Sequence, residues 1–155
     1  MKRFLPLVLF VTVFAALAPG AARADDAAVA ASVTKWTLRI APKATNLSTK
    51  VSSSSSPAQS LVFLRSLTRV ARQGAAAIST TKPSSRTGVK LKLFAKRSYV
   101  NFGNAGALLI RAVQMVKAGK SRAEITPIVN QATKLASLGS VQLKHASALI
   151  PKIVR

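Results

Sequence analysis

Four stretches of the chain carry apolar residues at the three- and four-residue spacing of an α-helix, not at the period of two of a half-buried strand. They cover residues 26–51, 57–79, 89–118 and 122–150. At 100° per residue, each places its main apolar residues on one stripe. The stripe of the first stretch consists of Val29, Val33, Trp36, Ile40, Ala44, Leu47 and Val51, and that of the second consists of Phe63, Leu64, Leu67, Val70, Ala71 and Ile78. The stripe of the third stretch consists of Leu91, Phe94, Phe102, Ala105, Leu109, Ala112, Val113 and Val116. The stripe of the fourth consists of Ile125, Ile128, Val129, Ala132, Leu135, Ala136, Gly139, Leu143, Ala146 and Ile150. The pattern predicts an all-α fold, an antiparallel up-down four-helix bundle in a single domain over residues 25–155.

Three polar segments mark the boundaries between these predicted helices. A serine run, Ser52–Pro57, ends in a Ser-Pro pair that is typical of an N-cap followed by proline at the first helical position. The segment Thr80–Gly88 is built from residues that compete with helix hydrogen bonding or fix turn geometry. Ser121 and Glu124 form a capping box, and Gly119 just before it suits a left-handed helix end.

Proline and glycine residues predict local departures from regular helices. Pro42 lies inside the first predicted helix and should kink or split it, because proline removes one backbone hydrogen bond and clashes one turn back. The last helix begins either at the capping box or at Thr126–Pro127, and the sequence leaves both starts open. Gly139 lies on the core stripe with Ala132, Ala136 and Ala146, and this run of small residues predicts close backbone packing against Ala105 and Ala112 of the preceding helix.

The first 24 residues have the three-part pattern of a cleavable secretory signal helix. Lys2 and Arg3 are followed by a 15-residue stretch, 4–18, without charge. Small residues precede two candidate cleavage points, after Ala24 or after Ala22. An uncleaved membrane anchor is the weaker interpretation, because a spanning helix needs roughly 20 apolar residues. We therefore expect a secreted, periplasmic or cell-envelope protein.

The charge of the chain is strongly one-sided. Its 155 residues include 24 Lys and Arg against 3 Asp and Glu, for a formal net charge of +21. Loss of residues 1–24 removes three basic residues and no acid, which leaves +18. A hydrophobic content of 49% argues against a disordered polycation. The chain has no cysteine, which excludes disulfides, thiolate metal sites and a thiol nucleophile.

The basic residues gather at two places away from the apolar stripes. The denser cluster crosses from a loop into a helix start and consists of Lys82, Arg86, Lys90, Lys92, Lys96 and Arg97. Positive charge at a helix start opposes the helix dipole, so a counter-anion there would help. The second group, opposite Leu67 on the second helix, consists of Arg65, Arg69 and Arg72. These nine residues are the candidate polyanion-binding residues.

Residues that could support catalysis, a metal or a cofactor are too few and too far apart. His145, the one histidine, falls on an outer face. It lies about 30 Å from Met115 along the bundle axis, so these two residues cannot bind the same haem iron. Asp25 and Asp26 fit a favourable charge at the start of the first helix, and Glu124 has its capping role. We therefore predict a non-enzyme with no cofactor and no metal.

The aromatic residues argue against sequence-specific binding of single-stranded nucleic acid, which needs exposed stacking platforms. Trp36, Phe63, Phe94 and Phe102 fall on core stripes. Tyr99 lies on a flank, where a half-buried ring with a solvated hydroxyl is expected.

Two classes of function follow from these patterns. The first is a non-catalytic, strongly basic protein that binds an anionic envelope polymer, an anionic lipid surface or nucleic acid without sequence specificity. A surface that only keeps the protein soluble is its competing interpretation. The alternative class is a structural or interaction module that oligomerises or binds a small apolar ligand between helices, through flank residues such as Val62, Leu108, Ile110 and Met115.

Overall fold

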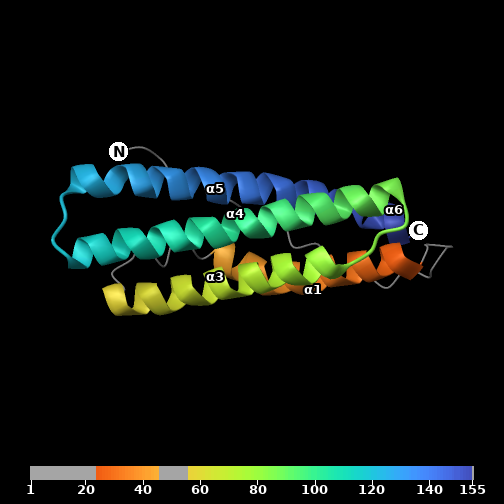
Figure 1. The fold of residues 1–155 in the computed structure, drawn as a ribbon, viewed down its shortest axis with the longest axis horizontal. Coiled ribbons are helices and arrows are strands. Elements are labelled where there is room, and N and C mark those ends of the chain that lie inside the picture. Colours follow the sequence, from red (N-terminus) through yellow and green to blue (C-terminus); the bar gives the residue numbers. More distant parts are fainter. Residues whose placement is uncertain (1–23, 46–55, 155) are drawn as a thin grey trace.

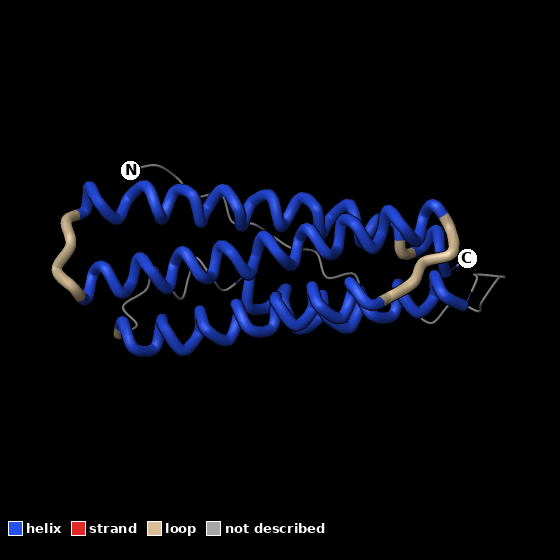
Figure 2. The backbone as a smooth tube through the Cα atoms, viewed as in Figure 1, coloured by secondary structure: helices blue, strands red, loops and turns tan. Residues whose placement is uncertain are grey.

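The computed structural model describes residues 24–45 and 56–154, and every regular element in these ranges is a helix (Figures 1 and 2). The helices are α1 (Ala24–Thr45), α3 (Pro57–Thr80), α4 (Arg86–Lys117), α5 (Arg122–Leu149) and the short α6 (Pro151–Val154). The four long helices pack antiparallel, which confirms the predicted all-α helical bundle. The predicted signal helix and the end of the first predicted helix, residues 46–51, lie outside the described residues.

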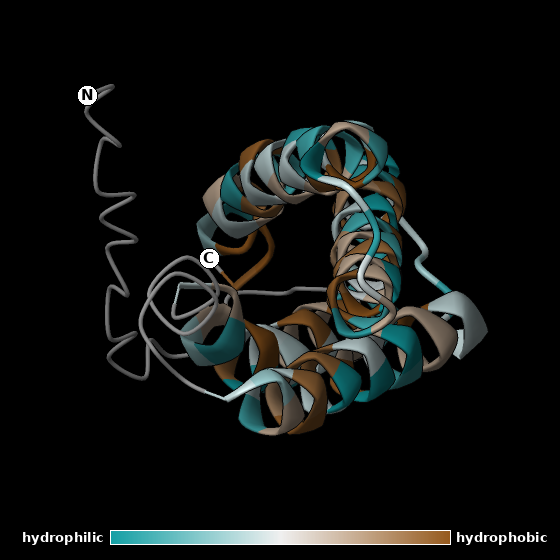
Figure 3. Cartoon of the chain, turned by 90° about the vertical axis from the view of Figure 1, so that its left-hand side faces the viewer, coloured by the Kyte–Doolittle hydropathy of each residue, from teal (hydrophilic) through white to brown (hydrophobic). Residues whose placement is uncertain are grey.

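Helix α4 is the central element of the bundle. It packs most extensively against α5 on one side and α3 on the other, while α1 packs against α3 and α4. The end-on view in Figure 3 shows α5, α4 and α3 following one another around a curve. Helix α6 closes one end of the molecule by contacting α1, α4 and α5. The side of α4 that points away from α1, α3 and α5 is therefore exposed to solvent, and we call it the outer side of α4.

Local caps, two from side chains and one from the backbone, set three of the helix ends where the sequence predicts them. The Ser56 hydroxyl accepts a hydrogen bond from the Gln59 backbone N–H, and Pro57 occupies the first helical position of α3. The capping box of Ser121 and Glu124 starts α5. At the end of α4, Gly119 has a φ of 69°, and the Lys120 backbone N–H bonds the carbonyl of Met115 at 3.0 Å. These ends depend on residues within a few positions of one another.

The two proline predictions have different outcomes. The described part of α1 continues through Pro42 to Thr45, so the helix is not split there. Of the two starts left open for the last helix, the structure has the capping box, and Pro127 lies inside α5. The capping box satisfies the backbone N–H groups of Ser121 and Glu124, so the helix can begin before Pro127 and lose only one internal bond there.

Helix α4 begins three residues earlier than predicted, at Arg86 instead of residue 89. The Ser85 hydroxyl accepts a hydrogen bond from the Gly88 backbone N–H at 3.0 Å and so caps the helix. The predicted boundary segment is consequently a loop of residues 81–85 only. Arg86, one of the candidate binding residues, is therefore part of the helix rather than of the loop.

The core has a large cluster and a small one. The large cluster joins α1, α3, α4, α5 and α6 around Leu67, Leu91, Tyr99 and Phe102. The small cluster, nearer the α4–α5 turn, consists of Leu64, Leu109 and Ala132. Beyond it the predicted stripes are poorly covered, and Val116 and Val129 are 55% and 37% exposed. These two predicted core positions are wrong, because the described part of α1 ends well before this end of the bundle and does not cover them (Figure 1).

The close packing expected at Gly139 is present, but with different partners. A Cβ on Gly139 would lie 3.2 Å from the Ser98 carbonyl oxygen and 3.3 Å from the Phe102 ring. The Ser98 hydroxyl donates to the Gly139 carbonyl at 2.7 Å. Gly139 itself therefore meets Ser98 and Phe102 rather than Ala105 or Ala112, because the register of α5 along α4 brings it one to four turns closer to the start of α4.

Tyr99 also differs from its expected environment, because its side chain is fully buried rather than half-buried. Its hydroxyl donates to the Val33 carbonyl at 2.9 Å and lies 3.0 Å from the Thr37 hydroxyl. Helix α1 covers the flank of α4 on which Tyr99 lies and supplies both partners. Among the other aromatic residues, Phe102 is buried, while Trp36, Phe63 and Phe94 are half-buried.

Candidate anion-binding face

Helices α3 and α4 bring the two predicted groups of basic residues onto one side of the molecule. Arg65, Arg69 and Arg72 are exposed on α3. The Cγ atom of Arg72 lies 3.4 Å from where a Cβ on Gly103 of α4 would be, so this arginine lies along the seam between the helices. The antiparallel pairing thus places the arginines of α3 beside the outer side of α4.

Most of the predicted residues of the denser cluster are exposed. Lys82 lies in the loop before α4, and Arg86, Lys90, Lys96 and Arg97 are exposed on α4. We call the nine predicted residues, on α3, the loop and α4, the basic face.

Lys92 is the exception on this face, because its ammonium group already has partners. Its Nζ donates to the Ser79 carbonyl at 2.9 Å and also to the Thr81 carbonyl. These two carbonyls belong to the C-terminal end of α3, where positive charge is favourable. Lys92 therefore joins α4 to α3 and is half-buried, so we regard it as a structural residue of the face rather than a freely available one.

Exposed basic residues lie on both sides of the outer surface of α4. Lys96 lies seven residues before Gly103, which contacts α3, so it is on the side of α4 nearer α3. Arg97 lies four residues before Asn101, whose side-chain amide donates to Gln142 of α5 at 2.9 Å, so it is on the side nearer α5. Lys90 lies on the same side as Arg97 at helical spacing.

One further basic residue belongs on this outer side but was not among the predicted ones. Arg111 is exposed on α4, fourteen residues after Arg97 and therefore on nearly the same side of the helix. Its distance along the chain from the dense cluster kept it out of the sequence prediction, although the helical spacing alone would have placed it there.

The counter-anion expected at the start of α4 is supplied by the protein itself. The Asp26 carboxylate of α1 accepts hydrogen bonds from the backbone N–H groups of Ser84 and Ser85 at 2.8 and 3.2 Å. Asp26 is only 4% exposed, so the interpretation of Asp26 as a simple charge at the start of the first helix is incomplete. Its carboxylate also lies at the N-terminal end of α4, where negative charge is favourable.

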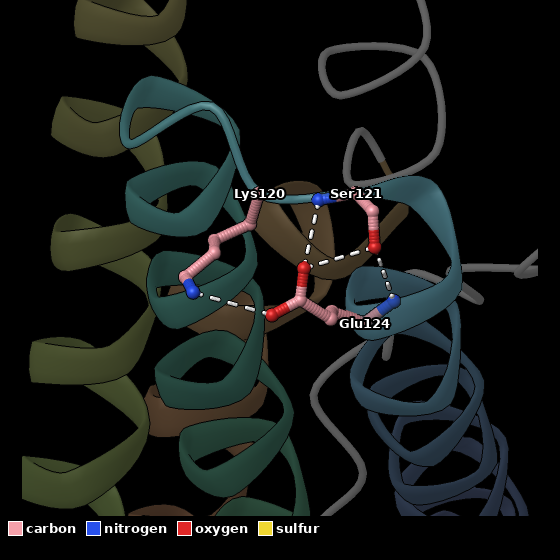
Figure 4. Close-up of polar contacts among 3 residues, drawn as sticks. All are labelled: Lys120, Ser121 and Glu124. Carbon is pink, nitrogen blue, oxygen red and sulfur yellow. Dashed lines mark hydrogen bonds and ion pairs between the residues drawn. The ribbon is translucent and has the colours of Figure 1, made fainter.

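Glu124 lies at the turn between α4 and α5 (Figure 4). It forms the one ion pair shown between described residues, with Lys120 at 3.3 Å. Hydrogen bonds from the Ser121 backbone and hydroxyl, together with Lys120, hold the pKa of the Glu124 carboxyl below its ordinary value. The carboxylate therefore stays charged and engaged at the turn.

Other kinds of site have little support in the described ranges. Residues 24–45 and 56–154 contain no group of three or more His, Cys, Asp or Glu side chains placed to hold a metal ion. Within the same ranges, no helix has the length and apolar content needed to cross a bilayer. His145 is exposed, as predicted, and its ring centroid lies 5.4 Å from that of Phe94.

A shallow hollow of about 660 Å³ lies between the end of α1 and the start of α3, beside Lys43, Val62 and Phe63. It is open to solvent. We assign it no ligand.

Comparison of the chain with protein-family models, with curated proteins and with solved structures found no match.

Proposed function

We propose that this protein is exported by its N-terminal signal and acts without catalysis, by binding an anionic surface or polymer through the basic face. The partner classes are an anionic envelope polymer, an anionic lipid surface and nucleic acid bound without sequence specificity. The binding residues are Arg65, Arg69, Arg72, Lys82, Arg86, Lys90, Lys96 and Arg97, with Lys92 holding α4 to α3.

One observation carries this proposal: eight of the nine predicted cations are exposed, on α3, on α4 and in the loop that joins these two packed helices. Of the three acids in the chain, Asp26 is buried beneath that loop, Asp25 is exposed next to it on α1, and Glu124 pairs with Lys120 elsewhere. Ordinary soluble surfaces mix charges of both signs. The positive field of the basic face attracts anions over about a Debye length. When a polyanion binds, its counterions are released into solution.

The experiment measures binding of the purified protein to duplex DNA and to vesicles rich in phosphatidylglycerol, at increasing NaCl concentration. Both affinities should fall steeply as salt rises, because the attraction is screened. Replacing Lys90, Lys96 and Arg97 by Gln should weaken vesicle binding about 100-fold, at about 1 kcal/mol for each basic residue. For DNA, the salt dependence should become shallower by about one unit of slope per lost phosphate contact.

A matched control separates the basic face from net charge. Lys134, Lys144 and Lys152 are exposed on α5 and α6, and replacing them by Gln removes the same charge from other surfaces. This control should bind nearly as tightly as the wild type. Equal losses in both variants would mean that net charge alone matters, and salt-independent or absent binding would refute the proposal.

Self-association is a second candidate function, and the exposed stripe residues at the α4–α5 turn support it. Val116 and Val129 are exposed there, and Met115 and Ile125 are half-buried beside them. Uncovered apolar residues at the end of a bundle can pair with a second copy. Light scattering at two protein concentrations tests this candidate, which requires a mass that rises with concentration.

A further inference from the structure

The outer side of α4 contains exposed aliphatic residues between Lys96 on one side and Lys90 and Arg97 on the other. Val89, Leu93 and Val100 are 51%, 41% and 40% exposed. Their spacing of four and seven residues puts them on one strip along the helix axis. By the same spacing, Lys96 flanks the strip on the side of α3, and Arg97 flanks it on the side of α5. The basic face is therefore a mixed surface, with an apolar strip along its middle.

The long basic side chains beside this strip allow charged and apolar groups to contact the same partner at the same time. Lysine and arginine can extend their charged ends beyond the shorter Val and Leu side chains while their stems cover apolar surface. A partner with anionic groups and an apolar layer just beneath them would satisfy both. The boundary between phosphate headgroups and acyl chains in a phospholipid layer has this arrangement.

The other anionic partner classes use only half of this surface. Duplex DNA and anionic wall polymers offer charge, but no apolar layer in which three aliphatic side chains could be buried. Their binding would leave the strip in water. Insertion of α4 across a bilayer is also disfavoured, because none of the described helices is apolar enough to span one, and the inner side of α4 packs against α3 and α5.

We propose that the outer side of α4 lies in the plane of an anionic phospholipid surface, with Val89, Leu93 and Val100 at the level of the upper acyl chains. The basic residues on either side bind the lipid phosphates. This inference rests on the proposed function and names its partner as anionic phospholipid.

The test separates the apolar contribution from the electrostatic one. Leu93 and Val100 are both replaced by Gln, which keeps helix propensity and net charge. The matched control replaces Leu38 and Val141, exposed by 59% and 51% on other surfaces, by Gln. Binding of each protein is measured to phosphatidylglycerol vesicles, to phosphatidylcholine vesicles and to duplex DNA. Circular dichroism and the fluorescence of Trp36, the one tryptophan, verify folding.

The Leu93 and Val100 variant should bind phosphatidylglycerol vesicles about tenfold more weakly than wild type. The two aliphatic side chains are already half-buried in the free protein, so only part of their hydrophobic burial energy is gained on binding and lost in the variant. Its DNA binding should be unchanged, and so should both affinities of the control variant. Wild type should retain some vesicle binding at a salt concentration that abolishes DNA binding, because apolar contacts are not screened.

Three results would overturn the inference and leave the proposed function intact. These are unchanged vesicle binding in the Leu93 and Val100 variant, an equal loss in the control variant, and wild-type protein that binds DNA but not phosphatidylglycerol vesicles. Absence of low-salt binding to both vesicles and DNA would instead refute the proposed function.

Discussion

At the residue scale, Tyr99 illustrates how a polar group is accommodated in an otherwise apolar core. Its buried hydroxyl would cost roughly 1–3 kcal/mol if it lacked a partner. It instead has two partners on α1, the Val33 carbonyl and the Thr37 hydroxyl. The phenol thereby fixes the position of α1 on α4 more specifically than an apolar ring of the same size could.

The ionisation of Tyr99 gives a prediction that can be measured directly. Burial raises the pKa of Tyr99 to about 12, and the hydrogen bond with Thr37 partly opposes this shift. Because Tyr99 is the one tyrosine in the chain, the absorbance of tyrosinate reports it alone. The folded protein should titrate near pH 12, and the protein in urea near the ordinary value of about 10.

The sign of the linked stability change follows from the raised pKa. The protonated phenol stabilises the folded state below pH 10, and this contribution is lost as the pH rises from about 10 toward 12. Its size is roughly 2 to 3 kcal/mol. A folded-state titration near pH 10 would contradict the buried position of the ring.

At the element scale, the contact between α1 and the start of α4 supplies a negative charge that the first turn of α4 lacks. Helix α4 begins with Arg86 in its first turn and no acid there, although the helix dipole favours negative charge at that end. Asp26 supplies the charge from α1 through the backbone of Ser84 and Ser85. This contact depends on Gly88, since a Cβ there would lie 2.2 Å from the Asp26 Oδ1 atom.

We predict that Gly88→Ala lowers the free energy of unfolding by roughly 2 kcal/mol, because it displaces Asp26 from two charge-assisted hydrogen bonds. Chemical denaturation monitored by circular dichroism measures this change. Gly103→Ala is the matched control, since its Cβ would make only an ordinary contact, 3.4 Å from Arg72. It should stabilise the protein by up to about 1 kcal/mol through helix propensity. Equal effects of the two substitutions would contradict the role of Gly88.

At the scale of the whole molecule, packing has to offset the mutual repulsion of the cations. The chain carries a formal net charge of +21, and the described residues form one ion pair, Lys120–Glu124. Self-repulsion of this kind destabilises a compact state. The α3–α4 interface concentrates it further, because both helices bring basic residues to the same side.

The thermal midpoint should therefore rise as NaCl increases from 10 mM to about 0.3 M, because added ions screen the repulsion. Calorimetry or circular dichroism measures the midpoint. The triple Gln variant of Lys90, Lys96 and Arg97 should have a smaller salt dependence than wild type. A midpoint that falls with salt would mean that favourable charge pairs, not repulsion, dominate the electrostatics.

The sequence by itself determined the features that depend on neighbours along the chain. Helical spacing predicted the four long helices, and Ser56, Gly119 and the Ser121–Glu124 capping box predicted their ends. Capping is local, because a side chain satisfies backbone groups two or three residues away. The nine basic candidates were also identifiable, since most exposed cations avoid the apolar stripe of their own helix. That they share one side followed only from the pairing of α3 with α4.

Only the tertiary structure decided which residues meet across helices. The partners of Gly139, the complete burial of Tyr99 and the position of Asp26 under the loop before α4 depend on helix register and on the packing of α1 against α4. Hydrophobic burial is non-directional, so an apolar stripe does not specify its partner or its register. Direct side-chain and backbone contacts fix both, and these exist only once the helices are packed.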